Sequence, residues 1–394
     1  MSEQTKNVAL ADGTTCRIAP SFDKGLMHTI AAESPMSFID GEKGVLEYVG
    51  LNIDDLARNS TFEECVYLLW HKRLPTASEL EIFQERIRDE YDLPDPMWEM
   101  IRQIPKYATP MAALRTLQSA LGMFDAEADI TSPEHAERKA IHLLARAPAI
   151  VAGFDRHRKG LPFLRPDPRM SVAQSLLYMM RGEKPSPLVS HAMDVVLILH
   201  ADHGLNASTF ASMVTISTLS DMYSAVTTAI GTLKGPLHGG ANMGVLKMLK
   251  EIGSIDRVEP YILDKLQRKD KVMGFGHRVY KARDPRATYL KEFTRDLAEE
   301  TGNTELFELA VKIEEIMERE VGHRGIYPNV DFYSALTFIC LGIEMDFFTP
   351  IFAMSRIAGW AGHCIEQLSD NKLMRPRAHY TGPHGVPYVP IEQR

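Results

Sequence analysis

The sequence has few cysteines and no long apolar run, and both shortages limit what the protein can be. Among its 394 residues no two cysteines form a CxxC pair or fit a zinc-binding spacing. We therefore expect buried thiols in a reducing compartment rather than a disulfide framework. The most apolar stretch, residues 336–354, is interrupted by two acidic residues and a proline and would be a poor membrane span. The four cysteines are Cys16, Cys65, Cys340 and Cys364.

The sequence also has no excess of positively charged residues. The formal net charge is −8, so broad electrostatic binding to nucleic acid or to an acidic membrane is not expected. The first residues, MSEQTKNVALADG, lack the basic start and apolar core of a signal peptide and the Arg-rich pattern of a mitochondrial presequence. These signals favour a cytoplasmic protein of a prokaryote. An anionic ligand would need a local cluster of cations.

Helical patterns dominate what is present. The segment Thr76–Glu79 is a capping box followed by apolar residues at helical spacing, and residues 306–316 carry another apolar stripe. Residues 193–199 are almost all apolar and predict a buried helix. Strand signals are few: residues 45–51 alternate weakly and could form part of a hairpin. The sequence predicts a mainly α-helical protein.

Two glycine-rich turns in the middle of the chain each carry a histidine. His238 lies in GPLHGGAN, just before a predicted helix at residues 241–250. The positive end of a helix dipole would lower its pKa, and a neutral imidazole can donate a hydrogen bond to a developing enolate oxygen. The alternative is a histidine that caps the helix beside a tight turn.

His277 lies in GFGHRVYKARDPR, where four cations follow within nine residues. Such a cluster can bind a carboxylate or a phosphate, and arginine offers two parallel donors for this purpose. The alternative is a solvated basic face, which most charge runs form. The four cations are Arg278, Lys281, Arg283 and Arg286.

Two further segments contain candidate functional residues. His200 and His203 are three residues apart, a spacing that could suit a metal, although one of such a pair is more often a core residue. Asn206 and Ser208 could cap the helix that follows. Asp331 lies between two apolar residues, where burial would raise its pKa toward that of a useful base. It could instead be the N-cap of a helix over residues 332–343.

Two isolated arginines complete the candidates. Arg356, in SRIAG, and Arg375, in RPRAHYTG, stand near predicted apolar helix faces. Either could bind an anion, or could be a surface residue with a buried stem.

The order of these segments is more specific than any one of them. The blocks GPLHGGAN, GFGHRVYKARDPR, YPNVDFYSA, SRIAG and RPRAHYTG follow one another as in the citrate synthase family. The earlier blocks SFIDGEKGVLEYVG and ILHADHGLNAST match as well. The chain resembles this family over about residues 25–385.

The resemblance implies a catalytic trio. Asp331 would take a proton from the methyl group of acetyl-CoA, His238 would stabilise the enol or enolate, and His277 would polarise the ketone of oxaloacetate. His203 would help to hold oxaloacetate. The implied reaction is the citrate-forming step of the tricarboxylic acid cycle, with CoA as part of a substrate and with no metal or bound organic cofactor.

The resemblance also implies binding residues and an assembly. Arg286, Arg356 and Arg375 would bind the carboxylates of oxaloacetate, with Arg375 reaching into the neighbouring site of a homodimer. Lys281 and Arg324 match positions that meet the phosphates of CoA.

The implied fold is all-α with two domains and the active site in the cleft between them. Residues 1–225 and 334–394 would form a large helical domain, and residues 226–333 a smaller inserted one. The chain lacks the additional N-terminal β domain of the larger NADH-inhibited enzymes, so we expect the smaller dimeric type. Met243, Gly244 and Ala335 depart from common family residues, which leaves the subfamily open.

Three alternatives to citrate synthase remain at this stage. A 2-methylcitrate synthase, which prefers propionyl-CoA, would share the fold and the trio. An inactive homologue could bind only CoA or a carboxylate. A metal hydrolase could use His200 and His203.

Overall fold

The structure is a computed structural model that describes residues 6–9, 15–18, 22–26, 28–239, 241–277 and 279–394. The chain forms two compact units. One contains residues 1–33 together with residues 375–394, and the other contains residues 34–374.

The described residues of the smaller unit have little regular structure. Strand β1 (Lys6–Ala9) pairs antiparallel with β2 (Thr15–Ile18), a hairpin that the sequence pattern did not predict. In the proline-rich C-terminal segment, the described residues form only one short 3-10 turn, η5 (Ile391–Gln393). Residues 380–394 contain three prolines, which cannot continue a helix, and this segment is otherwise extended.

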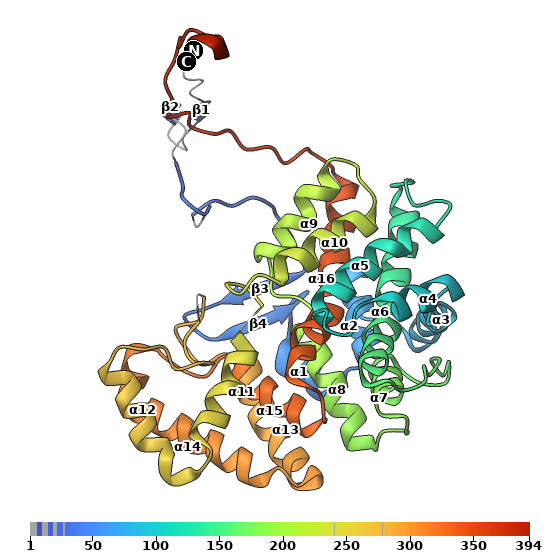
Figure 1. The fold of residues 1–394 in the computed structure, drawn as a ribbon, viewed down its shortest axis with the longest axis vertical. Helices are drawn as coiled ribbons and strands as arrows, with labels where there is room; N and C mark the ends of the chain where they lie inside the picture. The colour runs from blue at the N-terminus through green and yellow to red at the C-terminus, as the bar shows by residue number, and fades with distance from the viewer. Residues whose placement is uncertain (1–5, 10–14, 19–21, 27, 240, 278) are drawn as a thin grey trace. The chain divides into compact units, whose positions relative to one another are not determined.

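The larger unit is almost entirely helical, and the predicted all-α class is confirmed (Figure 1). Its described helices are α1 (Ile53–Asn59), α2 (Phe62–His71), α3 (Ala77–Asp89), α4 (Asp95–Gln103), α5 (Pro110–Leu121), α6 (Pro133–Lys159), α7 (Val172–Arg181), α8 (Pro187–His200), α9 (Ala207–Ser217), α10 (Met222–Leu233), α11 (Ala241–Ile252), α12 (Val258–Gln267), α13 (Pro285–Thr301), α14 (Thr304–Val321), α15 (Val330–Cys340) and α16 (Phe348–Ser369). The single-turn 3-10 segments are η1 (Gly122–Phe124), η2 (Ile255–Arg257), η3 (Gly322–Arg324) and η4 (Met345–Phe347).

Local sequence signals set the ends of several helices. The Thr76 hydroxyl accepts from the Glu79 amide, and the Glu79 carboxylate accepts from the Thr76 amide, so the predicted capping box begins α3. Gly302 adopts a left-handed conformation, with φ of 71°, and ends α13. The predicted apolar stripe lies on α14 and the predicted buried helix is α8.

A three-stranded antiparallel sheet precedes the helices. Strand β3 (Ser37–Asp40) pairs with β4 (Val45–Tyr48), which in turn pairs with β5 (Leu51–Asn52). This confirms the hairpin suggested by residues 45–51. Leu46 and Tyr48 are fully buried, so one face of the sheet packs on the helical core.

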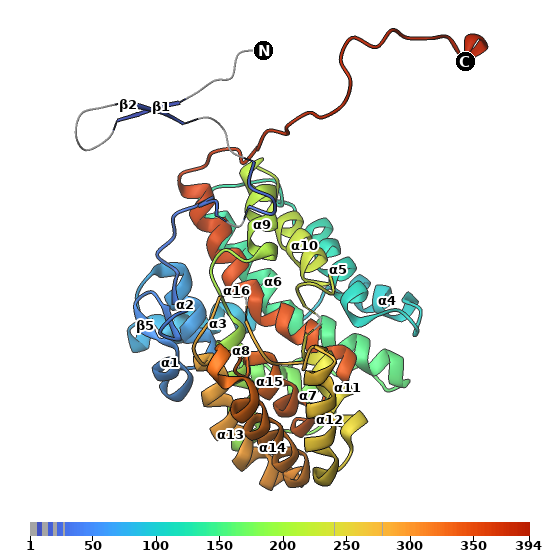
Figure 2. The same cartoon turned by 90° about the vertical axis from the view of Figure 1, so that its left-hand side faces the viewer.

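Helix α16 is the central element of the larger unit. It packs against α6, α9, α10, α2 and α8, and most of its length is buried (Figure 2). Helices α11–α15 gather at one end of this unit in both views, where α15 packs between α11 and α13. The predicted domain boundaries at residues 226 and 333 stay a prediction. No described helix combines the length and apolar character needed to cross a bilayer.

Helix α15 begins at a residue that also fixes a neighbouring loop. The Asn329 side chain accepts from the Asp331 amide at 3.0 Å and donates to the Gly276 carbonyl at 2.9 Å. The sequence expectation that Asp331 itself could cap this helix is therefore wrong. Asp331 lies in the first turn, where its side chain is not needed for capping.

We expect Asn329→Ala to lower the free energy of unfolding more than Thr76→Ala does. The loss of the Thr76 cap alone should cost about 1 kcal/mol. Asn329→Ala removes an equivalent cap and also leaves the Gly276 carbonyl without its donor, which adds about 1 kcal/mol. Urea unfolding of both variants measures the difference, and an equal or reversed order would contradict the double role of Asn329.

Candidate active site

The first turn of α15 presents a carboxyl group that is poised as a base. Asp331 is half-buried, and burial raises its pKa to about 6 although the nearby charges of Arg286 and Arg356 oppose the rise. Its carboxylate makes no hydrogen bond to the residues that the structure describes. A carboxyl group with this pKa is largely ionised at neutral pH and has its lone pairs available for a proton.

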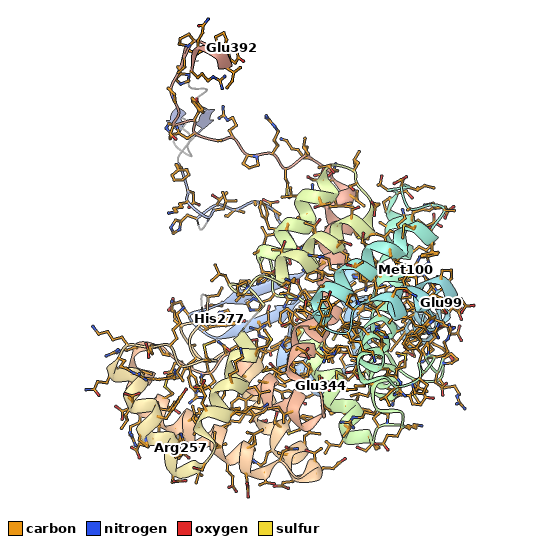
Figure 3. The ribbon with its side chains drawn as sticks, viewed as in Figure 1. Glu99, Met100, Arg257, His277, Glu344 and Glu392 are labelled. Atoms are coloured by element: carbon orange, nitrogen blue, oxygen red, sulfur yellow. The ribbon has the colours of Figure 1, made fainter. Side chains whose placement is uncertain are left out.

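His277 is held in one tautomer by the loop that follows it. Its Nδ1 accepts hydrogen bonds from the backbone amides of Val279, at 3.0 Å, and Tyr280, at 3.1 Å. Nε2 therefore carries the proton of the neutral ring and can donate it to a ligand. Burial, aided by the Arg286 charge, lowers the pKa of His277 to about 4. Figure 3 shows His277 beside the β3–β4 hairpin.

The loop before His277 requires glycine. Gly274 has φ of 81°, and a Cβ there would lie 2.8 Å from the Phe332 ring. The backbone amide of Gly276 donates to the Tyr327 carbonyl, and the amide of Asn329 donates to the Gly274 carbonyl. These bonds hold the His277 loop against the start of α15 and thus against Asp331.

His203 joins His277 in one aromatic cluster. The two imidazole rings lie 5.5 Å apart, and Nε2 of His203 is 3.2 Å from the Tyr280 hydroxyl. Burial, with the charges of Arg286 and Arg356, holds the pKa of His203 well below its usual value. The structure thus brings two of the predicted histidines together.

His200 points elsewhere and fits the alternative of a core histidine. Its Nδ1 lies 2.7 Å from the Val196 carbonyl, within its own helix, and its ring packs on Phe352. Across the described part of the chain, no three His, Cys, Asp or Glu side chains are grouped closely enough to hold a metal ion.

Arg286 is buried but already paired. Only 3% of it is exposed, and it forms two hydrogen bonds to the Asp284 carboxylate, at 3.0 and 2.8 Å. The same carboxylate accepts from the Val330 amide at 3.1 Å and caps α13 through the Arg286 amide. Asp284 therefore fixes Arg286 and the start of α15 in one arrangement.

Arg356 is buried without such a partner. It is 2% exposed, and its Nε donates to the His200 carbonyl at 2.6 Å. Within the described residues, no carboxylate forms an ion pair with its guanidinium. Burial lowers the pKa of Arg356 to about 10. A buried cation without a counterion is costly, and an anionic ligand at this position would supply one.

His238 lies against the first turn of α9. Its Nε2 is 2.8 Å from the Ser208 hydroxyl and 3.3 Å from the Ser208 amide, and Trp360 donates to the same hydroxyl at 3.1 Å. Burial, with the Arg356 charge, lowers the pKa of His238 to about 4. A lowered pKa agrees with the predicted neutral imidazole, and burial is its first cause. Asn206 caps α9 as expected, whereas Ser208 lies inside the helix.

The basic cluster after His277 divides into different roles. Arg283 forms ion pairs with Glu314, at 2.7 Å, and Glu318, at 2.6 Å, so it serves as a structural residue. Lys281 is exposed. Arg278 lies outside the described residues.

The two predicted CoA-binding cations lie on neighbouring segments. Arg324 is exposed and is followed by Gly325, where a Cβ would lie 2.7 Å from the Lys281 carbonyl oxygen. Arg375 is exposed and belongs to the smaller unit.

Sequence reasoning missed several residues that shape the site. Tyr280 meets both histidines, Ser208 meets His238, and Asp284 anchors Arg286. Asp284 carried a usable signal, because Asp-Pro at residues 284–285 is typical of a helix N-terminus. The other two have no local signal, since their contacts join distant parts of the chain.

Comparison with known proteins supports one family. The model of the family described as "Citrate synthase, C-terminal domain" matches residues 25–377. The chain belongs to the citrate synthase family. Citrate synthase 2 of Bacillus subtilis is 50% identical over 94% of this chain and 99% of its own length. A 2-methylcitrate synthase of Corynebacterium glutamicum is 41% identical over 94% of this chain and 97% of its own length.

Solved citrate synthase structures share the fold. The ternary complex of the Thermoplasma acidophilum citrate synthase with carboxymethyl coenzyme A and oxaloacetate has a TM-score of 0.89. It is 36% identical and covers 95% of this chain and 100% of that one. The two-domain citrate synthase fold implied by the sequence agrees with this likeness.

We expect Asp331→Asn to raise the melting temperature at pH 8. The folded pKa, about 6, is above the usual value of 3.8, so the ionised carboxylate destabilises the fold above about pH 6. This penalty, and with it the advantage of the variant, should vanish as the pH falls below 4. Thermal unfolding across this range measures the effect.

Asp167→Asn is a control of opposite sign. Hydrogen bonds from Arg169 lower the pKa of Asp167 to about 2, so its ionised form stabilises the fold at pH 8. A melting temperature of Asp331→Asn below that of the wild type at pH 8 would show that the carboxylate is structurally paired.

Proposed function

We propose that this member of the citrate synthase family condenses acetyl-CoA with oxaloacetate and hydrolyses the resulting citryl-CoA to citrate and CoA. The observation that carries the proposal is the buried, unpaired guanidinium of Arg356, which adjoins neutral imidazoles and a carboxyl of raised pKa. A small dicarboxylic keto acid fits these charges.

Oxaloacetate would supply the missing counterions. One carboxylate would meet Arg356 and the other the free part of Arg286, and His203 would help to hold the ligand. The protonated Nε2 of His277 would then face the ketone oxygen and draw electron density from the carbonyl carbon. A neutral donor suits this task because it polarises the oxygen and keeps its proton until the carbon–carbon bond forms.

Asp331 and His238 would act on acetyl-CoA from two sides. The Asp331 carboxylate takes a proton from the methyl carbon, and the C–H electron pair moves into the enolate. The Nε2 atom of His238 faces Ser208, so Nδ1 is the ring nitrogen that can donate to the enolate oxygen. The enolate carbon attacks the ketone carbon, whose oxygen takes the proton from Nε2 of His277. Water then cleaves the thioester and releases the CoA thiol.

Other parts of the proposal rest on the resemblance to the family. Lys281 and Arg324 would meet CoA phosphates, and their neighbouring, exposed positions support a shared role. Arg375 would bind oxaloacetate in the partner's site of a homodimer. We propose that the reaction uses no metal or bound organic cofactor and takes place in the cytoplasm as part of the tricarboxylic acid cycle.

A 2-methylcitrate synthase activity is the second candidate, and the relative in Corynebacterium glutamicum favours testing it. Propionyl-CoA carries one methylene more than acetyl-CoA, a difference worth about 1–3 kcal/mol in an apolar pocket. Some use of both substrates is therefore expected, with acetyl-CoA preferred.

Release of the CoA thiol from each acyl-CoA with oxaloacetate tests the function. We expect a higher kcat/KM for acetyl-CoA than for propionyl-CoA. Loss of one donor to an oxyanion costs about 3 kcal/mol, so His238→Ala should lower kcat by roughly 100- to 1000-fold. His135→Ala, a histidine at the start of α6, should leave kcat unchanged.

Two outcomes would contradict the proposal. A clear preference for propionyl-CoA would assign 2-methylcitrate synthase activity instead. No thiol release from either substrate would indicate a homologue that only binds CoA or carboxylates.

A further inference from the structure

The β3–β4 hairpin has a register that directs two polar side chains to one point. Ser37 pairs with Tyr48 across the two strands, and Ile39 pairs with Leu46. Because side chains alternate between the faces of a strand, these four residues share one face of the hairpin. That face is the one that packs on the helical core, since Leu46 and Tyr48 are fully buried.

The open end of the hairpin holds the residue next to His203. The Ser37 hydroxyl donates to the Asp202 carboxylate, and the Tyr48 hydroxyl lies 2.8 Å from the Asp202 carbonyl oxygen and 3.1 Å from its amide nitrogen. His363 of α16 forms an ion pair with Asp202 at 3.3 Å. Asp202 is thus fixed through its side chain and its backbone. The backbone position of His203, the next residue, and the orientation of its side chain are fixed as a result.

The closed end of the same hairpin holds the loop after His277. The Gly41 carbonyl accepts from the amides of Lys281, at 2.8 Å, and Ala282, at 3.3 Å. A Cβ at Gly44 would lie 2.5 Å from the Arg283 carbonyl oxygen, so the turn and the loop are in backbone contact. The turn itself is set by the Asp40 carboxylate, which accepts from two of its amides.

The hairpin therefore joins the two segments that carry opposite sides of the keto acid site. Residues 277–283 have no regular secondary structure among those described, so individual contacts fix the loop: the two amides on His277 Nδ1, the ion pairs of Arg283 and the contact with the hairpin. Between the described residues of these segments there is a single side-chain hydrogen bond, which joins His203 Nε2 and the Tyr280 hydroxyl. A rigid two-stranded element that touches both can hold them at a constant separation.

We propose that the β3–β4 hairpin is a positioning element that sets the spacing between His203 and the His277–Arg286 loop for oxaloacetate binding. Gly41, Gly44, Ser37 and Tyr48 are its positioning residues. This inference rests on the proposed function, because it assigns the ligand of that site.

The chain offers a matched pair of glycines for the test. Gly44 and Gly50 both have positive φ, 67° and 80°, so alanine at either position is strained to a similar degree. A Cβ at Gly50 would meet no atom within 4 Å, whereas one at Gly44 would collide with the Arg283 backbone. The difference between the two variants therefore isolates the contact with the loop.

We expect Gly44→Ala to weaken oxaloacetate binding at least tenfold relative to Gly50→Ala. Titration calorimetry with oxaloacetate alone measures the Kd, and thermal unfolding of both variants measures the strain that they share. A purely structural contact would lower the melting temperature without this difference in Kd. Equal Kd values for the two variants would overturn the proposal.

A second pair keeps the test decisive if Gly44→Ala does not fold. Ser37→Ala removes the hydroxyl that donates to Asp202, and Ser186→Ala removes a hydroxyl that donates to the Glu300 carboxylate at 2.7 Å, away from the hairpin. Only Ser37→Ala should raise the KM for oxaloacetate, by roughly threefold or more. Equal KM values would reject the hairpin's role. An inactive wild-type protein would instead reject the proposed function, so the two failures are distinguishable.

Discussion

A buried guanidinium that no described carboxylate contacts directly is the constraint on which the site depends. Arg356 extends from the central helix α16 and is held by the His200 carbonyl, and burial lowers its pKa to about 10. An anionic ligand that pairs with such a group would offset its desolvation cost. Arg286, by contrast, is neutralised by Asp284 and contributes orientation more than net charge. The positive charge that is not paired directly within the site therefore comes mainly from Arg356, and an anionic ligand would balance it.

The same charge and burial set the protonation of every reacting group. The Arg356 charge adds to burial in lowering the pKa of His238 and His203, and Arg286 does the same for His277. These imidazoles are thus neutral donors at working pH. The charges of Arg286 and Arg356 also act on Asp331, yet burial raises its pKa to about 6. At neutral pH its carboxylate is therefore mostly ionised, and it is a stronger base than an ordinary aspartate. Burial beside the two arginines therefore produces both the neutral imidazole donors and the carboxylate base.

The sequence predicted what local pattern and motif order determine. Helix ends with capping boxes or glycines, such as α3 and α13, follow from local backbone requirements and were predictable. The trio of His238, His277 and Asp331 was named from motifs, and their environments agree with the chemistry assigned to them. Two capping predictions failed because neighbouring polar residues compete for the same role: Asn206 rather than Ser208 caps α9, and Asn329 rather than Asp331 caps α15. No local signal shows that Tyr280 would meet His203, because 77 residues separate them.

The most direct test of the central claim is titration calorimetry of oxaloacetate into the wild type and Arg356→Met, with thermal unfolding of both. Methionine keeps most of the side-chain length and removes the charge, so a buried cation kept for a ligand should be replaced at little cost in stability. We predict a melting temperature that changes little, because relief of the buried charge offsets the lost bond to the His200 carbonyl, together with a Kd that is at least 100-fold weaker, or about 2.7 kcal/mol. A lower melting temperature with an unchanged Kd would contradict this prediction, because Arg356 would then be a structural residue and the anion would bind elsewhere.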